Sequence, residues 1–255
     1  MTRQAPDAVL LDFGGVLVDV VARTGGLREI ALDVHALLKR EHANAIDLAR
    51  IERDVRAGWE AYDKWKSAEG RRRRPREIAH REFWDELVAA DWPSRARGVV
   101  ADHASELCKR IDVATKDRPA KPDALSTLRG LADRGIRTAI VSNALCGAGS
   151  RELVRAHGFE PYLGAQVYSD EAGVRKPNPE IFEGAARLLG VPLARCWYVG
   201  DTIDRDVLGG RRAGVAKVIL MPSNHTGRGI DAVADPDAVI KRPEELLVLL
   251  PVPVP

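Results

Sequence analysis

The sequence predicts an α/β fold, a doubly wound parallel sheet into which an α-helical domain is inserted. Short apolar runs recur along the chain, and each of them ends in a polar or glycine-containing segment. Apolar runs without alternation are typical of strands that are buried on both faces, as in parallel sheets. Segments with the apolar spacing of helices lie between these runs, which favours an open α/β sheet. The stretch from Thr24 to Thr115 lacks such runs, and this indicates an insertion.

Four apolar runs are predicted to form strands, namely Ala8–Leu11, Arg137–Val141, Cys196–Val199 and Lys217–Met221. Helices are predicted over Pro122–Arg134 and Pro179–Leu189, where leucine, isoleucine and alanine recur at helical spacing. Each of these two segments begins with a proline, which suits a first helical turn, and is followed by a glycine, which favours termination.

The inserted stretch contains four groups of apolar residues at helical spacing, which begin at Leu27, Ile51, Ile78 and Val99. Four of the five tryptophans also fall there, so we expect a helical bundle with a small core of its own. The chain is therefore predicted to have two domains, an α/β core formed by residues 1–22 and 116–255 and a helical domain formed by residues 23–115. The basic run Arg71–Arg74 is expected in an exposed turn.

Composition restricts the partners of the protein. Of the 255 residues, 45% are hydrophobic and 30% are charged, and the net charge of +2 gives no reason to expect nucleic acid as a partner. No apolar run approaches the ~20 residues of a membrane span. Met1–Asp7 lacks the apolar run of a signal peptide, and Pro251–Pro255 is expected to be a frayed tail. Nothing in the sequence predicts an oligomeric state.

The three cysteines, Cys108, Cys146 and Cys196, show no CxxC spacing. An odd number of cysteines without this spacing argues against a disulfide framework and against a zinc site. It fits a reducing compartment, and we therefore expect a cytoplasmic location.

Polar residues follow several of the predicted strands. Asp12 follows the first strand, Ser142 and Asn143 the second and Asp201 the third, with Asp206 in the next turn. In open α/β sheets, ligands bind outside the carboxyl ends of the strands. Two carboxylates at this edge would repel each other unless a cation lay between them, and Mg²⁺ prefers such hard oxygen ligands. A hydroxyl and a lysine, for which Lys176 is the candidate, would then hold a phosphoryl group.

Each of these residues also has a purely structural interpretation. Asp12 precedes two glycines and suits a tight turn, and Ser142–Asn143 suits a helix cap. Asp206 suits the first turn of a helix, where the dipole favours acids. The functional interpretation is favoured because all of these blocks are expected at one edge of one sheet.

Four blocks of the sequence resemble the haloacid dehalogenase-like (HAD) hydrolase superfamily. They are DFGGVL at 12–17, VSN at 141–143, VRKPNPEIF at 174–182 and YVGDTIDRDVLGGRRAG at 198–214. The resemblance extends over residues ~8 to 221, and its last two blocks are highly specific. It implies a Rossmann-like core, with the helical insertion as a cap domain, and a small phosphorylated molecule as the substrate.

The resemblance also implies roles for individual residues. Asp12 is expected to be the nucleophile that forms an aspartyl-phosphate. Ser142, Asn143 and Lys176 are expected to bind the phosphoryl group, and Lys176 also offsets the charge of Asp12. The expected Mg²⁺ ligands are Asp12, the backbone carbonyl of Gly14, Asp201 and Asp206, the last of these either through a bound water or by orienting Lys176. Asp204 is expected to face solvent.

The sequence departs from the phosphatase motif at Gly14. The motif has an aspartate there, which protonates the leaving oxygen and later deprotonates the attacking water; glycine keeps only the backbone carbonyl. Loss of general acid–base catalysis typically costs ~10²- to 10⁴-fold in rate. The favoured interpretation is a phosphomonoesterase in which a residue of the helical domain, a water or the substrate handles the proton.

Three alternatives remain for this departure. The first is hydrolysis at a carbon–halogen or carbon–phosphorus bond, the latter with an imine-forming lysine such as Lys39, Lys64 or Lys66. The second is a phosphomutase. The third is a non-catalytic protein that binds phosphate or a protein partner and has a regulatory role.

Further polar and aromatic residues have weaker interpretations. The aromatic residues of the insertion are expected mainly in its core, and its histidines at the surface or at helix caps; these histidines are His35, His42, His80 and His103. Asn224 and His225 follow the last predicted strand and would lie at the same sheet edge.

Overall fold

The computed structural model describes residues 5–227 and 234–251. Residues 1–4, part of the segment predicted not to be a signal peptide, and residues 252–255 of the predicted frayed tail lie outside the described residues. Its main sheet has six parallel strands in the order β5-β4-β1-β6-β7-β8. These are β1 (Ala8–Leu11), β4 (Arg137–Ser142), β5 (Ala165–Tyr168), β6 (Cys196–Gly200), β7 (Lys217–Leu220) and β8 (Ala238–Val239). The predicted parallel sheet is thus confirmed.

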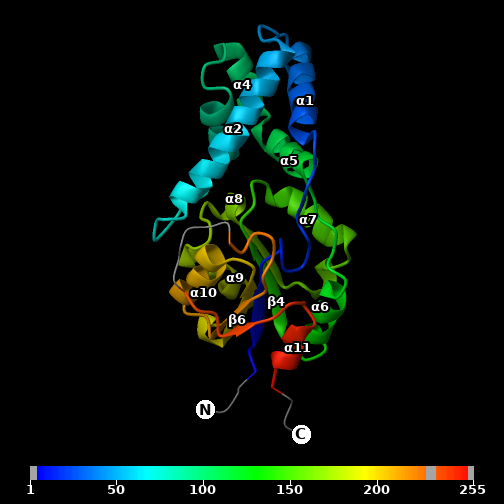
Figure 1. The fold of residues 1–255 in the computed structure, drawn as a ribbon, viewed down its shortest axis with the longest axis vertical. Helices are drawn as coiled ribbons and strands as arrows, with labels where there is room; N and C mark the ends of the chain where they lie inside the picture. Colours follow the sequence, from blue (N-terminus) through cyan, green and yellow to red (C-terminus); the bar gives the residue numbers. More distant parts are fainter. Residues whose placement is uncertain (1–4, 228–233, 252–255) are drawn as a thin grey trace.

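The central strand β1 is buried on both faces. Val9 and Leu11 pack into one hydrophobic cluster, whereas Ala8 and Leu10 pack into another on the opposite face, and all four side chains are at most 2% exposed. Successive residues of a strand point to opposite faces, which is why the run has no alternation. Helices α6 (Ala124–Ala132), α7 (Gly147–Ala156) and α11 (Glu245–Leu249) cover the first face. Helices α9 (Pro179–Leu189) and α10 (Leu208–Ala213) cover the second (Figure 1).

Strand pairing brings three loops to one edge of the sheet. Leu11 pairs with Ile140 of β4 and with Val199 of β6. Because these strands are parallel, the residues that follow them leave the sheet at nearly the same level. The loops after β1, β4 and β6 therefore lie side by side, as expected from the sequence.

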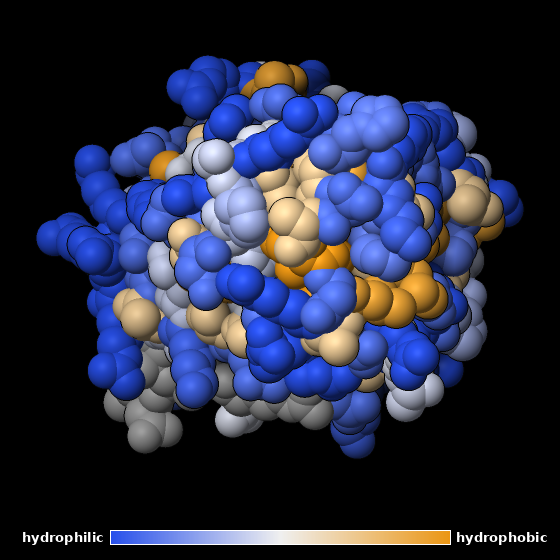
Figure 2. Space-filling model, turned by 90° about the horizontal axis from the view of Figure 1, so that it is seen from above, coloured by the Kyte–Doolittle hydropathy of each residue, from blue (hydrophilic) through white to orange (hydrophobic). Residues whose placement is uncertain are grey.

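The helices of residues 26–115, which we call the helical insert, form a separate layer beyond this edge (Figure 1). They are α1 (Gly26–Arg40), α2 (Leu48–Glu69), α3 (His80–Glu82), the π-helical η1 (Phe83–Val88), α4 (Ser94–Asp102) and α5 (Ala104–Thr115). Buried side chains such as Ile30, Val55 and Trp84 give the insert its own hydrophobic core. Seen from the end of the insert, the surface is mostly hydrophilic around a smaller hydrophobic area (Figure 2). The short antiparallel strands β2 (Val21–Ala22) and β3 (Lys116–Asp117) pair where the chain enters and leaves the insert.

Several boundaries differ from the sequence prediction. The fourth helical pattern of the insert is two helices, because the backbone leaves the helical conformation at His103 between α4 and α5. Helix α6 begins at Ala124 rather than at Pro122. Strands β5 and β8 were not predicted, since runs of four and two residues give little periodic signal. The remaining elements are short, namely η2 (Glu160–Tyr162), α8 (Ser169–Ala172), η3 (Leu193–Arg195) and η4 (Ile203–Val207).

The basic run Arg71–Arg74 lies in an exposed turn, as predicted, and it also contacts the core. The Arg212 guanidinium donates to the carbonyl oxygens of Arg72 and Arg73, at 3.3 and 3.4 Å. Arg74 forms an ion pair with Glu180 at 3.4 Å. In the described residues, no helix combines the length and the apolarity that crossing a membrane requires. The three cysteines are buried and free.

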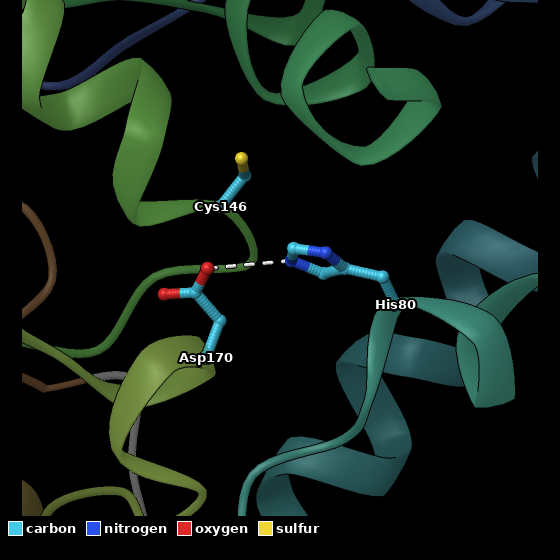
Figure 3. A group of neighbouring side chains, drawn as sticks. All are labelled: His80, Cys146 and Asp170. Carbon is cyan, nitrogen blue, oxygen red and sulfur yellow. Dashed lines mark ion pairs between the residues drawn. The ribbon is translucent and has the colours of Figure 1, made fainter. Parts of the chain in front are cut away.

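A second contact between insert and core centres on His80, at the start of α3 (Figure 3). Its Nε2 lies 3.3 Å from an Asp170 carboxylate oxygen and 2.7 Å from the Leu145 carbonyl oxygen. Its Nδ1 lies 3.0 Å from the Ser105 hydroxyl. The hydrogen bond to Asp170 raises the pKa of His80 above 6.5, and the charge of Glu77 acts in the same direction. These contacts fasten the insert to the core, and the ion pair with Asp170 favours the protonated imidazole.

Replacing His80 by glutamine should lower the free energy of unfolding by about 1 kcal/mol near pH 5.5 and by less near pH 8.5. A histidine whose pKa is raised on folding stabilises the protein fully below its unfolded pKa of 6.5, and this contribution is lost as the pH rises through the folded value. Urea unfolding at the two pH values measures the difference. The control is His35→Gln on α1, and an equal loss at both pH values would contradict the ion pair.

Candidate active site

Asp12 follows β1 directly and lies at the floor of a cavity. Its side chain is 11% exposed, and its Oδ2 lies 2.8 Å from the ammonium of Lys176. The backbone N–H of Phe13 donates to Oδ1 at 2.7 Å. Burial raises the pKa of Asp12, against the attraction of Lys176. The turn beyond it requires Gly15, whose φ is +80° and where a Cβ would lie 2.3 Å from a carboxylate oxygen of Asp201.

Lys176 connects two carboxylates at the centre of the site. Its side chain is 2% exposed, and its Nζ lies 2.8 Å from Asp12 and 2.7 Å from Asp206. Nζ also donates to the Tyr198 hydroxyl at 2.9 Å. Burial disfavours the ammonium, but the two carboxylates outweigh burial and raise the pKa of Lys176. The lysine is therefore charged.

Asn143 positions the backbone of Lys176. Its Oδ1 accepts from the Lys176 N–H at 2.8 Å, and its Nδ2 donates to the Lys176 carbonyl at 3.1 Å. Both ends of the side-chain amide are thus used within the protein. The side chain of Asn143 therefore has a positioning role, and the binding of phosphate by Asn143 stays a prediction.

Asp206 orients the groups around it. Its Oδ1 accepts from Lys176 and from the Tyr198 hydroxyl, the latter at 2.6 Å. Its Oδ2 accepts from the backbone N–H of Thr202 at 2.9 Å and from the Thr202 hydroxyl at 2.6 Å. Although burial opposes ionisation, Lys176 and Arg205 lower the pKa of Asp206 below its usual value. Of the two roles predicted for Asp206, these contacts favour the orientation of Lys176 over a contact with the metal through a bound water.

Asp201 lies at the end of β6, held by residues that follow β7. The Ser223 hydroxyl donates to its Oδ2, and the Thr226 hydroxyl donates to its backbone carbonyl at 2.6 Å. Burial, together with the charges of Asp206 and Asp12, raises the pKa of Asp201 to about 7. Such a buried acidic cluster is relieved when a cation binds it.

The acidic cluster fits Mg²⁺. Asp12, Asp201 and Asp206 each present a carboxylate oxygen, and these oxygens lie within 4.8 Å of one another. All three side chains are buried. Carboxylates and backbone carbonyls are the hard oxygen ligands that Mg²⁺ prefers, and Mg²⁺ usually takes only one or two carboxylates. Asp12, Asp201 and the carbonyl of Gly14 would hold the ion, with Asp206 committed to Lys176.

A cavity of about 840 Å³ lies between the sheet edge and the insert. The core contributes Asp12, Gly14, Ser142, Lys176 and Asp201 to its wall, and the insert contributes Trp59, Tyr62 and Lys66. Its volume is in the range of small-molecule sites. The cavity therefore has room for a substrate above Asp12.

Other predicted residues are placed differently in relation to this cavity. Asp204, predicted to face solvent, is only 7% exposed and lines the cavity, because η4 turns it inward; that prediction was wrong. Asn224 and His225, which could reach this edge according to the sequence, also line the cavity. The four histidines of the insert do not belong to its wall. Of the lysines considered for imine formation, Lys66 lines it and is 29% exposed.

The structure adds residues that sequence reasoning missed. Tyr198 bonds both Lys176 and Asp206, and Ser223 holds Asp201. Tyr198 lies within an apolar strand, where a hydroxyl that needs a buried partner is the available signal. Ser223 lies two residues after the end of the last predicted strand, at the same edge as Asp12 and Asp201.

The chain is similar to several known proteins. The chain is 39% identical over 129 residues to the glyceraldehyde 3-phosphate phosphatase of Methanopyrus kandleri, a match that covers 49% of this chain and 54% of that protein. It is 32% identical over 143 residues to the phosphoserine phosphatase of Thermus thermophilus, covering 56% of this chain and 53% of that protein. The structure of CbbY from Rhodobacter sphaeroides in complex with phosphate superposes with a TM-score of 0.62 at 18% identity, over 96% of this chain and 99% of that one. This last likeness shows the shared fold.

The matched part of the chain spans about half the length of these curated relatives. A sequence model described as a haloacid dehalogenase-like hydrolase matches residues 6–214, which is most of the 255-residue chain. The chain therefore belongs to the haloacid dehalogenase-like hydrolase family.

Proposed function

We propose that the protein is a Mg²⁺-dependent phosphomonoesterase that acts on a small phosphorylated metabolite through an aspartyl-phosphate at Asp12. The observation that carries this proposal is the position of the Asp12 carboxylate, 2.8 Å from a buried lysine at the floor of a cavity. The family of the chain and the phosphatases among its relatives support it.

In the proposed reaction, an Asp12 oxygen attacks phosphorus and displaces the alcohol or phenol. The ammonium of Lys176 and the hydroxyl of Ser142, which both line the cavity, bind the phosphoryl oxygens. Lys176 is kept charged and in place by Asp206, Tyr198 and Asn143. When bound, Mg²⁺ offsets the negative charge of the phosphoryl group and of the carboxylates. Water then hydrolyses the aspartyl-phosphate and restores Asp12.

Gly14 determines which esters react well. It offers no side chain to protonate the leaving oxygen, so the leaving group must depart as an anion or take its proton from water. We therefore propose that phenols and anomeric sugar oxygens leave more easily than simple alcohols.

We further propose that residues 23–115 act as a cap that encloses the substrate. Trp59, Tyr62 and Lys66 of α2 line the cavity opposite Asp12. A cap of this kind excludes water from the site and strengthens its electrostatic interactions.

The free cysteines support a reducing, cytoplasmic location.

Phosphate release with and without metal tests the proposed function. With Mg²⁺, p-nitrophenyl phosphate and a panel of phosphorylated metabolites should release phosphate, and removal of the metal with EDTA should lower the rate at least ~100-fold. Restoring Mg²⁺ should restore the rate. Tight binding of phosphate without any turnover across the panel would instead favour a binding protein.

One observation favours a second candidate, hydrolysis of a carbon–phosphorus bond through an imine. Burial and the neighbouring Lys116 lower the pKa of Lys66 to about 8, and Lys66 lines the same cavity as Asp12. The neutral amine is the form of lysine that reacts with a carbonyl group, and a lowered pKa increases the fraction of this form. Borohydride reduction in the presence of phosphonoacetaldehyde would attach the substrate to Lys66 under this alternative, and leaves Lys66 unmodified under the phosphomonoesterase proposal.

A further inference from the structure

The end of the cavity that faces the insert carries three cations, Lys66 of α2, Lys116 of β3 and Arg118. Together with the neighbouring Trp59 of α2 and Asp112 of α5, they form what we call the distal site. All of these residues line the cavity that contains Asp12. They come from the insert and from the segment where the chain returns to the core. The distal site plays no part in the phosphoryl chemistry described above.

The ammonium groups of Lys66 and Lys116 share one aromatic ring. They lie 6.0 and 5.4 Å from the centre of the Trp59 ring. Burial lowers the pKa of both lysines. The positive charge of Lys116 lowers the pKa of Lys66 further, and the positive charge of Arg118 lowers that of Lys116. Like charges held this close to a common cavity are unfavourable until an anion enters.

The carboxylates beside these lysines do not fully neutralise them. Asp63 pairs with Lys66 at 2.5 Å, but its side chain is 58% exposed, so that solvent screens the pair. Asp112 lies 3.6 Å from Lys116 and closer, at 2.6 Å, to Arg118. A single buried carboxylate is thus divided between two cations.

Arg118 has a further unused donor. Its side chain is 9% exposed, and within the described part of the chain neither its Nη1 nor Oδ2 of Asp112 makes a hydrogen bond. Buried donors without a partner are rare in proteins and are usually satisfied by a ligand or water. By contrast, Arg175, which also lines the cavity, is paired at 2.9 Å with the buried Glu77. Arg175 therefore adds no unpaired positive charge to the cavity.

We infer that the substrate carries a second anionic group, a carboxylate or a second phosphate, which binds between Lys66 and Lys116 while its phosphoryl group lies at Asp12 and Lys176. This inference rests on the proposed phosphatase function and narrows its substrates to molecules with two anionic ends. Trp59 and Tyr62 give the connecting part of the substrate a largely aromatic wall.

Matched ligand pairs test the inference. ω-Carboxyalkyl phosphates of increasing chain length are compared with their uncharged primary amides, and alkanediol bisphosphates with the corresponding monophosphates. Affinity is measured by calorimetry on the Asp12→Asn protein, and phosphate release on the unmodified protein. The dianionic member of at least one pair should bind about 10-fold or more tightly, in line with a charge-assisted hydrogen bond. The two series distinguish a carboxylate from a second phosphate.

Three lysine variants identify the site responsible. Lys66→Met and Lys116→Met, each added to Asp12→Asn, should reduce the preference for the dianion to about onefold. Lys64→Met, an exposed lysine on the same helix, should leave the preference unchanged. Circular dichroism of each variant establishes that it is folded.

The outcomes separate this inference from the proposed function. Phosphate release with no preference for dianions at any chain length leaves the phosphatase standing and overturns the distal site. A preference that depends on Lys66 and Lys116, without phosphate release by the unmodified protein, supports the distal site and overturns the phosphatase. A preference that survives in both lysine variants also overturns the distal site.

Discussion

Replacing Asp12 by asparagine should reduce Mg²⁺-dependent phosphate release by about 10⁴-fold or more, the scale of loss seen when a catalytic nucleophile is removed. Asparagine has nearly the same shape, but its amide cannot form the acyl phosphate. Lys176 keeps its ion pair with Asp206 at 2.7 Å and its bond to Tyr198, so the rest of the site should keep its arrangement. The measurement is the steady-state rate on p-nitrophenyl phosphate.

The same variant should be at least as stable as the original protein. Asp12, Asp201 and Asp206 are crowded and buried, and the charges of the other two help to raise the pKa of Asp201 to about 7. Removing one of these charges relieves repulsion. Asp19→Asn, at a half-exposed aspartate on the same loop, is the control for both rate and thermal unfolding. Substantial turnover by a folded Asp12→Asn protein would mean that water attacks the substrate directly and that Asp12 is not the nucleophile.

The main sheet and its active edge were predictable because they depend on local sequence. The run Ala8–Leu11 is apolar throughout, and in a parallel sheet this alone indicates burial on both faces. Once the strands are parallel, residues such as Asp12 and Asp201 that follow them must meet at one edge. The geometry of the sheet, rather than any single motif, brings these carboxylates together.

What the sequence did not reveal depends on contacts between distant segments. The side-chain amide of Asn143 could serve a ligand or the backbone of Lys176, and only the fold shows that it bonds to Lys176. Asp204 was expected to face solvent, but η4 carries it to the cavity wall. Lys66 and Lys116 meet at the Trp59 ring because α2 packs against the segment that returns to the core. The spacing of apolar residues in the sequence does not predict this contact.

Restoring a carboxyl group at the position of the missing acid should increase turnover of simple alkyl phosphates by about 100-fold in the variant Gly14→Asp. The backbone of Gly14 is not among the glycines with positive φ, so an L-residue can adopt it. A Cβ there would lie 3.1 Å from a methyl group of Val20, which needs to move by a few tenths of an ångström. Gly15 tolerates no such change, because a Cβ there would lie 2.3 Å from Asp201.

The gain from Gly14→Asp should depend on the leaving group. An alkoxide leaves poorly without a proton, whereas p-nitrophenolate leaves readily, so the ratio of the rates on alkyl and p-nitrophenyl phosphates should rise towards one. Gly14→Asn has the same size without the acid and should give no gain, which separates proton transfer from packing. If folded Gly14→Asp protein processes alkyl phosphates no faster than Gly14→Asn, the absent acid is not what limits this enzyme. The proton must then already be supplied by another group in the cavity, and His225, which lines it, is one candidate.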